Sequence, residues 1–330
     1  AIKKPVTDRT GIILDIFAQR ARTREARTQV ELARLQYILP RLTGMWSHFT
    51  RQRGGVGMRG EGETQLEMDR RMTKARIADL RRELEEIRKQ AETRRKGRVD
   101  AFKVSLVGYT NAGKSTLMNA LTEAGVLAEN RLFATLDATM RTLELPSGEQ
   151  VLLTDTVGFI RKLPTNLVAS FRSTLDEILD ANLILHVVDV SHRAYEDHIH
   201  ATNQVLAELG ASDKPMVMVF NKIDMMEAAG TRTRLRELFP DDAVVIAAKT
   251  GEGLDDLLRV VQRHFEAERR TVQLKLSPSQ QKAVALLHQR ARVISTDYDE
   301  DGNTLLKVLI TAKDLGQVAA EAGHALEPIG

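Results

Sequence analysis

Residues 108–115, with the sequence GYTNAGKS, combine residue types and a spacing that suit the binding of phosphate groups. An apolar run precedes them and a helical pattern follows, which is the context of a phosphate-binding loop (P-loop). The Lys114 ammonium would contact the β- and γ-phosphates of a nucleotide, and the Ser115 hydroxyl would ligate Mg²⁺. We expect nucleotide contacts from Gly108, Tyr109, Thr110, Asn111, Ala112, Gly113, Lys114, Ser115 and Thr116.

A second segment, with the sequence DTVG, ends another apolar run further along the chain. Asp155 would hold Mg²⁺ through water, and the Gly158 N–H would contact the γ-phosphate, as in a nucleotide-dependent switch. Between the two motifs, Phe133 is expected beside the nucleotide, and Thr135 is favoured over Thr139 as the residue that closes over Mg²⁺. The predicted metal ligands are Ser115, Thr135 and Asp155, and the predicted catalytic residues are Lys114, Thr135 and Gly158.

The segment N-K-I-D predicts which base the site selects. The Asp224 carboxylate can accept hydrogen bonds from both N1–H and the exocyclic amine of guanine, a donor pair that adenine lacks. Lys222 would lie over the purine face, and Asn221 would brace the loop. A covering loop is expected at Ala247, Ala248 and Lys249. Its Ala248 N–H would donate to guanine O6, and Ala247 stands where such loops usually have a serine that braces them. The motifs together predict a GTP-hydrolysing switch.

The hydrolysis step departs from that of the small switch proteins, because Phe159 follows Gly158 where they have the glutamine that orients the attacking water. We therefore expect slow intrinsic hydrolysis and an external activator. Arg141 and Arg161 could stabilise transition-state charge, although solvated or structural roles are favoured for both. Asn111 could ligate K⁺, with structural bracing as the favoured alternative.

The composition is that of a globular protein, with 42% hydrophobic and 28% charged residues among 330, and without a run long enough for a membrane span. The absence of cysteine gives no reason to expect secretion, so a cytoplasmic location is predicted. Residues 1–100 carry 24 Lys and Arg against 14 Asp and Glu, a net charge of +10, which leaves −7 for the remainder of the +3 total. This asymmetry favours a polyanionic partner for the first third, with a solvated basic helix as the alternative.

The elements that would position these residues fall into three predicted domains: 1–100, 101–270 and 271–330. The first would be an antiparallel hairpin of two helices with narrow apolar stripes, interrupted at Pro40 and joined by a mobile Gly/Arg-rich tip over residues 51–63. The second alternates apolar strands with helices, which indicates a parallel-dominated sheet covered on both faces. The third would be a small α+β domain. The predicted fold class is thus α/β with a helical hairpin before it and an α+β domain after it.

The assembled segments resemble the HflX family of ribosome-associated GTPases, in the Obg-HflX group. The distinctive segments are DRTGIILDIF from Asp8, GETQLE with DRR after the glycine tip, FATLD from Phe133, and the continuation DTVGFIR from Asp155, besides the P-loop. The resemblance covers nearly all of the chain. Family members have a further N-terminal subdomain, and we expect that this chain lacks most of it, with a remnant at residues 1–20.

The resemblance implies a GTPase that uses Mg²⁺, binds the 50S ribosomal subunit and its 23S rRNA through the helical hairpin, and splits stalled 70S ribosomes. Hydrolysis would be stimulated by the ribosome, which agrees with Phe159 in place of glutamine. The protein is expected to be a monomer. The alternatives are a GTP-regulated rRNA-binding adaptor and a 50S assembly factor without splitting activity. An ATP-dependent activity of the first 100 residues is disfavoured, because they contain no phosphate loop.

Overall fold

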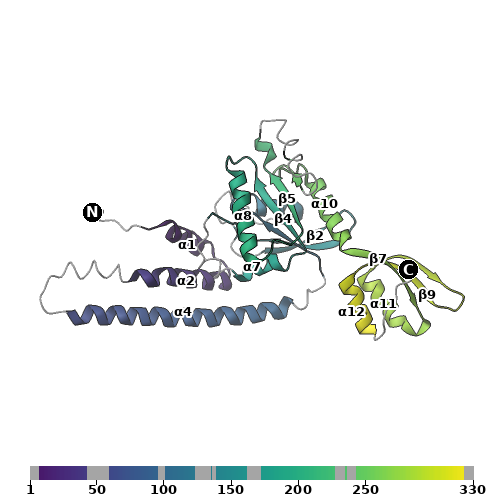
Figure 1. Cartoon of the computed structure of the whole chain (residues 1–330), viewed down its shortest axis with the longest axis horizontal. Coiled ribbons are helices and arrows are strands. Elements are labelled where there is room, and N and C mark those ends of the chain that lie inside the picture. Colours follow the sequence, from purple (N-terminus) through teal and green to yellow (C-terminus); the bar gives the residue numbers. More distant parts are fainter. Residues whose placement is uncertain are drawn as a thin grey trace. The chain divides into compact units, whose positions relative to one another are not determined.

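The computed structural model in Figure 1 describes residues 7–42, 59–95, 101–122, 135, 139–161, 172–226, 235 and 243–322. The chain falls into two compact units. One is built on residues up to Leu257 apart from the turn Leu145–Gly148, and the other on that turn and the residues from Leu258 onward. The helical hairpin and the nucleotide-binding sheet thus belong to one unit, and the three-domain division remains a prediction.

The described chain begins with two helices, the second of which belongs to the hairpin. Helix α1 (Arg9–Arg20) begins after Asp8, whose carboxylate accepts a hydrogen bond of 2.9 Å from the Gly11 N–H. Helix α2 (Arg24–Ile38) is capped in the same way by Thr23 and passes into the 3-10 turn η1 (Leu39–Arg41). Pro40 lies in this turn, so the predicted interruption of the helix is confirmed. Helix α1 was not predicted from the sequence.

Helix α4 (Arg59–Arg95) packs antiparallel to α2. The direction follows from two ion pairs, Arg24 with Glu83 and Glu31 with Arg76, because the partner number falls as the residue number rises. The apolar seam between the two helices contains the predicted stripe residues Leu32, Leu35, Leu39, Ile77, Leu80 and Leu84.

The prediction of a loop over residues 51–63 is wrong for residues 59–63, which are helical. Helix α4 begins at Arg59 and therefore includes Gly60 and Gly62, while residues 51–58 lie outside the described part. Each glycine costs a helix roughly 1 kcal/mol relative to alanine, and a helix as long as α4 can propagate through both of them.

Truncation of the seam at Leu80 should destabilise the hairpin. The Leu80 side chain is 1% exposed, so Leu80→Ala removes buried methyl groups and leaves a cavity, for an expected loss of about 2–4 kcal/mol of unfolding free energy. Urea denaturation followed by circular dichroism measures it. Met72→Ala is the matched control on the same helix, because Met72 is 64% exposed and its truncation should cost under about 0.5 kcal/mol.

The nucleotide-binding part is a six-stranded sheet in the order β2-β3-β1-β4-β5-β6, parallel except for the edge pair β2 with β3. The alternation of apolar strands with helices that was predicted is present, while β2, whose exposed residues break the apolar pattern, was not predicted. The strands are β1 (Lys103–Val107), β2 (Thr139–Glu144), β3 (Gln150–Asp155), β4 (Leu183–Asp189), β5 (Met216–Asn221) and β6 (Ala243–Val245). The helices are α5 (Lys114–Thr122), α7 (Arg172–Leu179), α8 (Tyr195–Leu209) and α10 (Leu254–Ala267), with the 3-10 turn η3 (Ile223–Met225).

The second unit is the small α+β part that was predicted, with a three-stranded antiparallel sheet in the order β7-β9-β8. Its helices pack on one face of the sheet around a core of aliphatic side chains. The elements are β7 (Arg269–Leu276), η4 (Pro278–Gln280), α11 (Gln281–Arg290), β8 (Arg292–Tyr298), β9 (Thr304–Thr311) and α12 (Ala312–Ala322). Within the described ranges, no helix of either unit is long and apolar enough to cross a bilayer.

Candidate nucleotide-binding site

The predicted motifs meet at one edge of the sheet, where the parallel strands end. Leu106 of β1 lies opposite Asp155 of β3, and Asp189 of β4 lies opposite Asn221 of β5. The P-loop leaves β1 at Gly108 (φ 149°), where a Cβ would stand 2.2 Å from the carbonyl oxygen of Val187. Only glycine fits this position, and it lets the loop turn tightly into α5.

The three residues predicted to bind Mg²⁺ lie in mutual hydrogen-bond contact. Ser115 Oγ donates to Asp155 Oδ2 at 2.6 Å, Thr135 Oγ1 donates to the same oxygen at 2.9 Å, and the two hydroxyl oxygens are 2.8 Å apart. The other oxygen, Asp155 Oδ1, is buried without a hydrogen-bond partner among the described residues. Mg²⁺ prefers oxygen ligands and binds through one or two carboxylates with phosphate and water, so this oxygen set fits it.

The P-loop lysine is buried, with 6% of its surface exposed. Lys114 Nζ donates to the carbonyl oxygens of Gly108 and Tyr109 at 3.1 and 3.2 Å. Burial lowers the pKa of Lys114 to about 8, against the opposing effect of the Asp155 charge, and burial raises the pKa of Asp155. The lysine is therefore still cationic at neutral pH, as charge stabilisation on phosphate requires.

The switch segment is bonded directly to the P-loop. Phe159 N–H donates to Gly108 O at 3.0 Å, and Thr110 N–H donates to Phe159 O at 2.8 Å. A Cβ on Gly158 would stand 2.7 Å from Thr110 Cα and 3.1 Å from Lys114 Nζ. The Phe159 side chain is buried in the core beneath α7, with Leu175 among its neighbours, so it cannot orient a water molecule at the phosphates.

The N-K-I-D segment, predicted to recognise the base, is held by two hydrogen bonds of its asparagine. Asn221 Nδ2 donates to Ala112 O at 2.9 Å, and its Oδ1 accepts from the Ala248 N–H at 3.0 Å. This N–H, expected to donate to guanine O6, therefore already has a partner, and its contact with the base remains a prediction. Asp224 is exposed and is the middle residue of the 3-10 turn η3.

The covering loop has no serine, yet backbone hydrogen bonds hold it. Ala247 N–H donates to Glu252 O at 2.9 Å, and Ala247 O accepts from the N–H groups of Thr250 and Gly251 at 3.1 and 3.0 Å. The loop is thus held by backbone hydrogen bonds at Ala247, without a side-chain hydroxyl there. Lys249 lies exposed next to them.

The remaining predicted residues have different surroundings. Arg161 pairs with Asp197 of α8 at 3.2 Å, which agrees with the structural role favoured for it. Arg141 is exposed on β2. Asn111 has a left-handed backbone (φ 64°), and its carbonyl oxygen accepts from Lys222 Nζ at 2.9 Å, which is a bracing contact. Phe133 lies outside the described residues.

Sequence reasoning missed the contacts between this site and the N-terminal helices. Val157 and Ile160 of the switch segment share a hydrophobic cluster with Ile13, Leu14 and Phe17 of α1. Further members come from α2 and its surroundings: Ala21, Ala26, Val30 and Ala33. The capping Asp8 and the apolar spacing of α1 could have revealed the helix, but nothing in the sequence pairs it with the switch.

The contacts of the Tyr109 side chain with other elements were also not predicted from the sequence. Its ring stacks on the imidazole of His198 in α8, with centroids 3.8 Å apart, and its hydroxyl accepts from the Arg161 N–H at 3.2 Å. Arg9 of α1 donates to the carbonyl oxygen of the same Arg161 at 2.7 Å. The P-loop, the end of the switch segment, α8 and α1 therefore meet around one aromatic side chain.

The buried His186 of β4 should make the free energy of unfolding depend on pH. Burial, with a contribution from the Lys114 charge, lowers the pKa of His186 to about 3, so the folded protein keeps it neutral while the unfolded chain protonates it below about pH 6.5. The contribution of His186 to the free energy of unfolding therefore falls as the pH drops below 6.5, by up to about 1.4 kcal/mol per pH unit. His186→Gln should flatten the profile between pH 6.5 and 4, as measured by urea denaturation. His200→Gln, at an exposed site of α8, should leave the slope unchanged.

A P-loop, a D-x-x-G switch segment and an N-K-x-D base segment at one edge of a parallel sheet define a P-loop GTPase. Three family profiles match the chain: "GTP-binding GTPase Middle Region" over residues 20–98, "50S ribosome-binding GTPase" over 103–222 and "HflX C-terminal domain" over 235–327. The chain belongs to the HflX family of GTPases, as the sequence resemblance indicated.

Relatives agree with this assignment. GTPase HflX of Magnetococcus marinus is 48% identical over 96% of this chain and 73% of its own length, and GTPase HflX of Escherichia coli is 44% identical over 94% and 73%. Among solved structures, a GTP-binding protein from Sulfolobus solfataricus in complex with GDP matches 78% of this chain and 72% of its own, with 26% identity and a TM-score of 0.51. The chain is therefore a guanine-nucleotide-binding, GTP-hydrolysing protein of this family.

Proposed function

We propose that this GTPase binds the 50S ribosomal subunit through its helical hairpin and splits stalled 70S ribosomes, with hydrolysis stimulated by the ribosome. The observation that carries the proposal is the hydrophobic cluster that joins Val157 and Ile160 of the switch segment to α1 and α2. Packed side chains transmit displacement, so a change of the switch with nucleotide would shift these helices. Helix α2 in turn shares its seam with α4.

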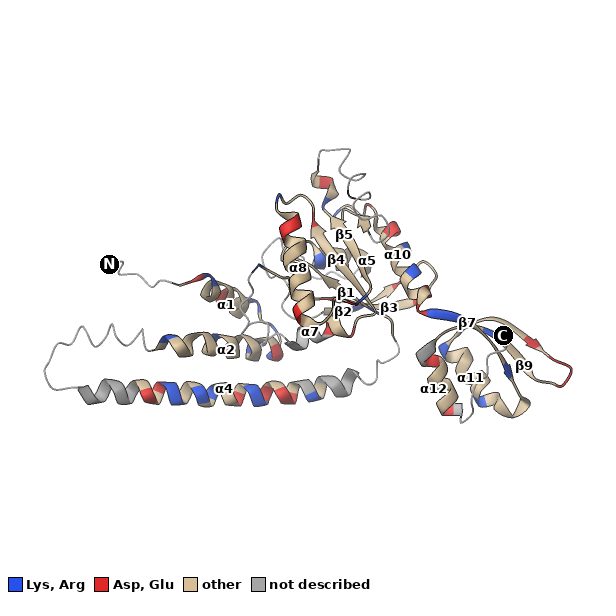
Figure 2. Cartoon of the chain, viewed as in Figure 1, with Lys and Arg blue, Asp and Glu red and all other residues tan. Residues whose placement is uncertain are grey.

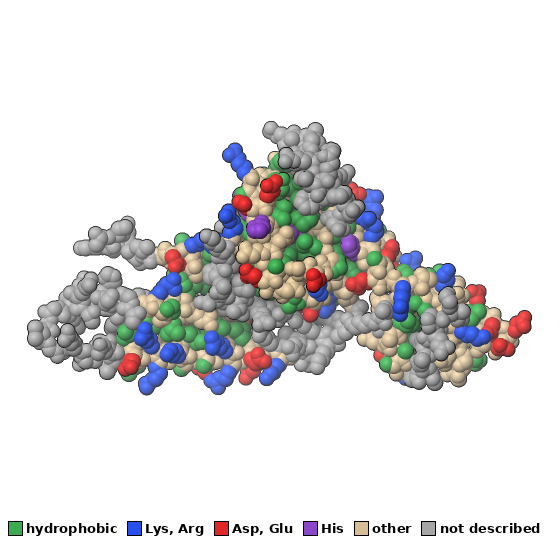
Figure 3. Space-filling model, in the orientation of Figure 1, with side chains coloured by type: hydrophobic (Ala, Val, Ile, Leu, Met, Phe, Trp, Pro, Cys, Tyr) green, Lys and Arg blue, Asp and Glu red, His purple; other side chains and the backbone are tan. Residues whose placement is uncertain are grey.

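The charge of the hairpin supports an RNA partner. The first 100 residues carry a net charge of +10. Figure 2 shows Lys and Arg, interspersed with Asp and Glu, along the described part of α4, and Figure 3 shows basic side chains at the surface over the same helix. Exposed examples are Arg71, Lys74 and Arg81. Such cations lower the free energy of binding to phosphate groups through release of counterions.

Within the site, Ser115, Thr135 and Asp155 would hold Mg²⁺, which would neutralise charge on the phosphates. Lys114 would stabilise charge on the β- and γ-oxygens, Thr135 would close over the metal, and the Gly158 N–H would contact the γ-phosphate. Because Phe159 is buried, the attacking water would be oriented by another group, and we assign that group to the ribosome-bound complex. Asn111 would brace Lys222, with K⁺ binding as the alternative role.

The central experiment measures GTP hydrolysis with and without 50S subunits, together with 70S splitting by light scattering. We expect 50S subunits to raise kcat at least about tenfold, and the GTP-bound protein to lower the scattering of 70S particles. Stimulation without splitting would favour the rRNA-binding adaptor or the 50S assembly factor. Stimulation below about tenfold would contradict ribosome-activated hydrolysis.

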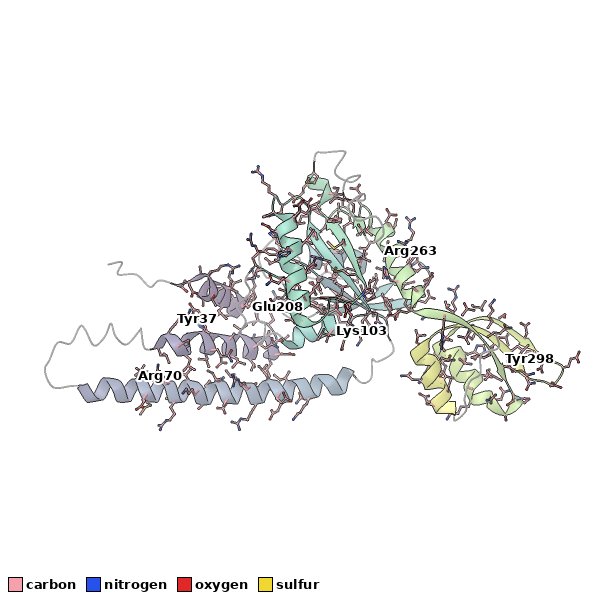
Figure 4. All side chains as sticks on the ribbon, viewed as in Figure 1. Tyr37, Arg70, Lys103, Glu208, Arg263 and Tyr298 are labelled. Carbon is pink, nitrogen blue, oxygen red and sulfur yellow. The ribbon has the colours of Figure 1, made fainter. Side chains whose placement is uncertain are left out.

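The hairpin assignment has its own test. Ribosome pelleting with a GTP analogue, GDP or no nucleotide is compared for wild type and a triple variant in which Arg71, Lys74 and Arg81 are changed to Ala. Loss of three phosphate contacts should weaken binding uniformly and reduce its salt dependence. Arg263→Ala on α10, labelled in Figure 4, is the control for a basic residue outside the hairpin. A further variant with Arg51, Arg53 and Arg59 changed to Ala extends the test to the start of α4 and to two arginines outside the described residues.

A further inference from the structure

Asp189, the last residue of β4, belongs to none of the nucleotide motifs but lies beside the base-recognition segment. It is paired in parallel register with Asn221 of β5. The pairing continues one residue further, because the Val190 N–H donates to Asn221 O at 3.1 Å. The end of β4 is therefore held against the backbone from which Lys222 projects.

The Asp189 carboxylate is fixed at both oxygens. Its Oδ2 accepts from Lys222 Nζ at 2.6 Å, and its Oδ1 accepts from the N–H and the hydroxyl of Ser191 at 3.0 and 2.6 Å. The side chains of Asp189 and Lys222 are only 15% and 23% exposed. An ion pair so largely withdrawn from water, with a carboxylate already oriented by two further donors, has a more defined geometry than a surface pair.

Lys222 joins three separate parts of the site. Its backbone is left-handed (φ 66°), which is uncommon for a residue other than glycine. Its Nζ donates to Asn111 O of the P-loop at 2.9 Å as well as to Asp189. With its Cα held in the base segment and its ammonium held between β4 and the P-loop, the position of its methylene chain is determined at both ends.

We infer that Asp189 is a positioning residue for guanine-nucleotide binding: it anchors the Lys222 ammonium so that the methylene chain covers one face of the purine. The inference rests on the proposed role of residues 221–224 as the guanine site and extends that site to the end of β4. Because Lys222 would touch the ring face and not the 2-amino group, Asp189 would contribute to affinity for purine nucleotides and not to the choice between guanine and hypoxanthine. A purely local role for Asp189 would be to hold the turn at Ser191.

The test is Asp189→Asn, which keeps the shape and an acceptor oxygen but removes the charge. We expect GDP release and the KM for GTP to rise about tenfold with kcat unchanged, and the KM for inosine triphosphate to rise by the same factor. Asp180→Asn is the matched control, since Asp180, in the turn after α7, is a carboxylate paired with a lysine, Lys103 of β1, at 3.8 Å. Ser191→Ala should change the KM by less than about threefold.

A double-mutant cycle keeps the inference testable if one variant is poorly folded. Lys222→Met retains an unbranched side chain without the ammonium, and it should raise GDP release as Asp189→Asn does, with no further increase in the double variant. Additive effects, an unchanged KM, or a fall in kcat alone in Asp189→Asn would overturn the inference. Asp224→Ala tests the guanine site separately: if it leaves the preference for GTP over inosine triphosphate intact, the proposed base site itself fails, whatever Asp189 does.

Discussion

Asp224→Asn is expected to change the substrate of this GTPase from GTP to xanthosine triphosphate. Guanine presents two donors, N1–H and the 2-amino group, which a carboxylate can accept together. A carboxamide offers one acceptor and one donor, so it would face the 2-amino group with its own NH₂. Xanthine has N1–H beside a C2 carbonyl oxygen and matches the carboxamide. We expect kcat/KM for GTP to fall by about 10³-fold or more, because a site built around paired polar groups strongly rejects a mismatched partner.

The measurement is hydrolysis of each nucleotide by wild type and variant, at the same Mg²⁺ concentration. Asp213→Asn is the control, since Asp213 is an exposed aspartate in the same unit outside all motifs. Its base preference should equal that of wild type. Continued preference of Asp224→Asn for GTP would remove Asp224 from the role of base selector. Loss of both substrates with a lowered unfolding temperature would instead indicate damage to the loop.

Much of the site could be predicted because its geometry follows from local rules. Parallel strands end at one edge of a sheet, so motifs that follow apolar runs must meet there. That reasoning placed Ser115 and Asp155 together although they are far apart in the chain, and the structure has their oxygens 2.6 Å apart. Thr135 was chosen as a threonine between the two motifs, and its hydroxyl lies within 3 Å of both. The small α+β character of the second unit could also be predicted, and strands β7 and β9 there alternate between buried and exposed residues.

The unforeseen features depend on contacts between distant segments. No property of Val157 or Ile160 alone indicates that they pack against α1, since apolar residues after a switch motif could equally face the sheet. The Asp189–Lys222 ion pair required the strand register, which a sequence does not contain. The helix at Gly60 and Gly62 was missed because local propensity was given more weight than propagation from the long helix that follows.

The switch segment's contact with the P-loop leads to the second large expected effect. Gly158→Ala introduces a Cβ at 2.7 Å from Thr110 Cα, closer than folded proteins tolerate. Backbone cannot move aside as a flexible side chain would, and this backbone is held by the hydrogen bonds between Thr110 and Phe159 and between Phe159 and Gly108. The segment must therefore move away, and the N–H that would contact the γ-phosphate moves with it. We expect kcat to fall by about 10²- to 10³-fold, the usual effect of losing one aligned donor.

The segment predicted to bind the base lies on other strands, so the affinity of Gly158→Ala for GDP should stay within about threefold of wild type. A loss of hydrolysis with GDP binding retained would assign the effect to the switch segment. Displacement of the segment would also disturb Val157 and Ile160 in the cluster with α1 and α2. The variant should then bind ribosomes equally with GDP and with a GTP analogue, in contrast to wild type. Gly316→Ala is the control, because a Cβ there meets no atom within 4 Å. Full 50S-stimulated hydrolysis by Gly158→Ala would show that the contact with the P-loop does not limit the reaction.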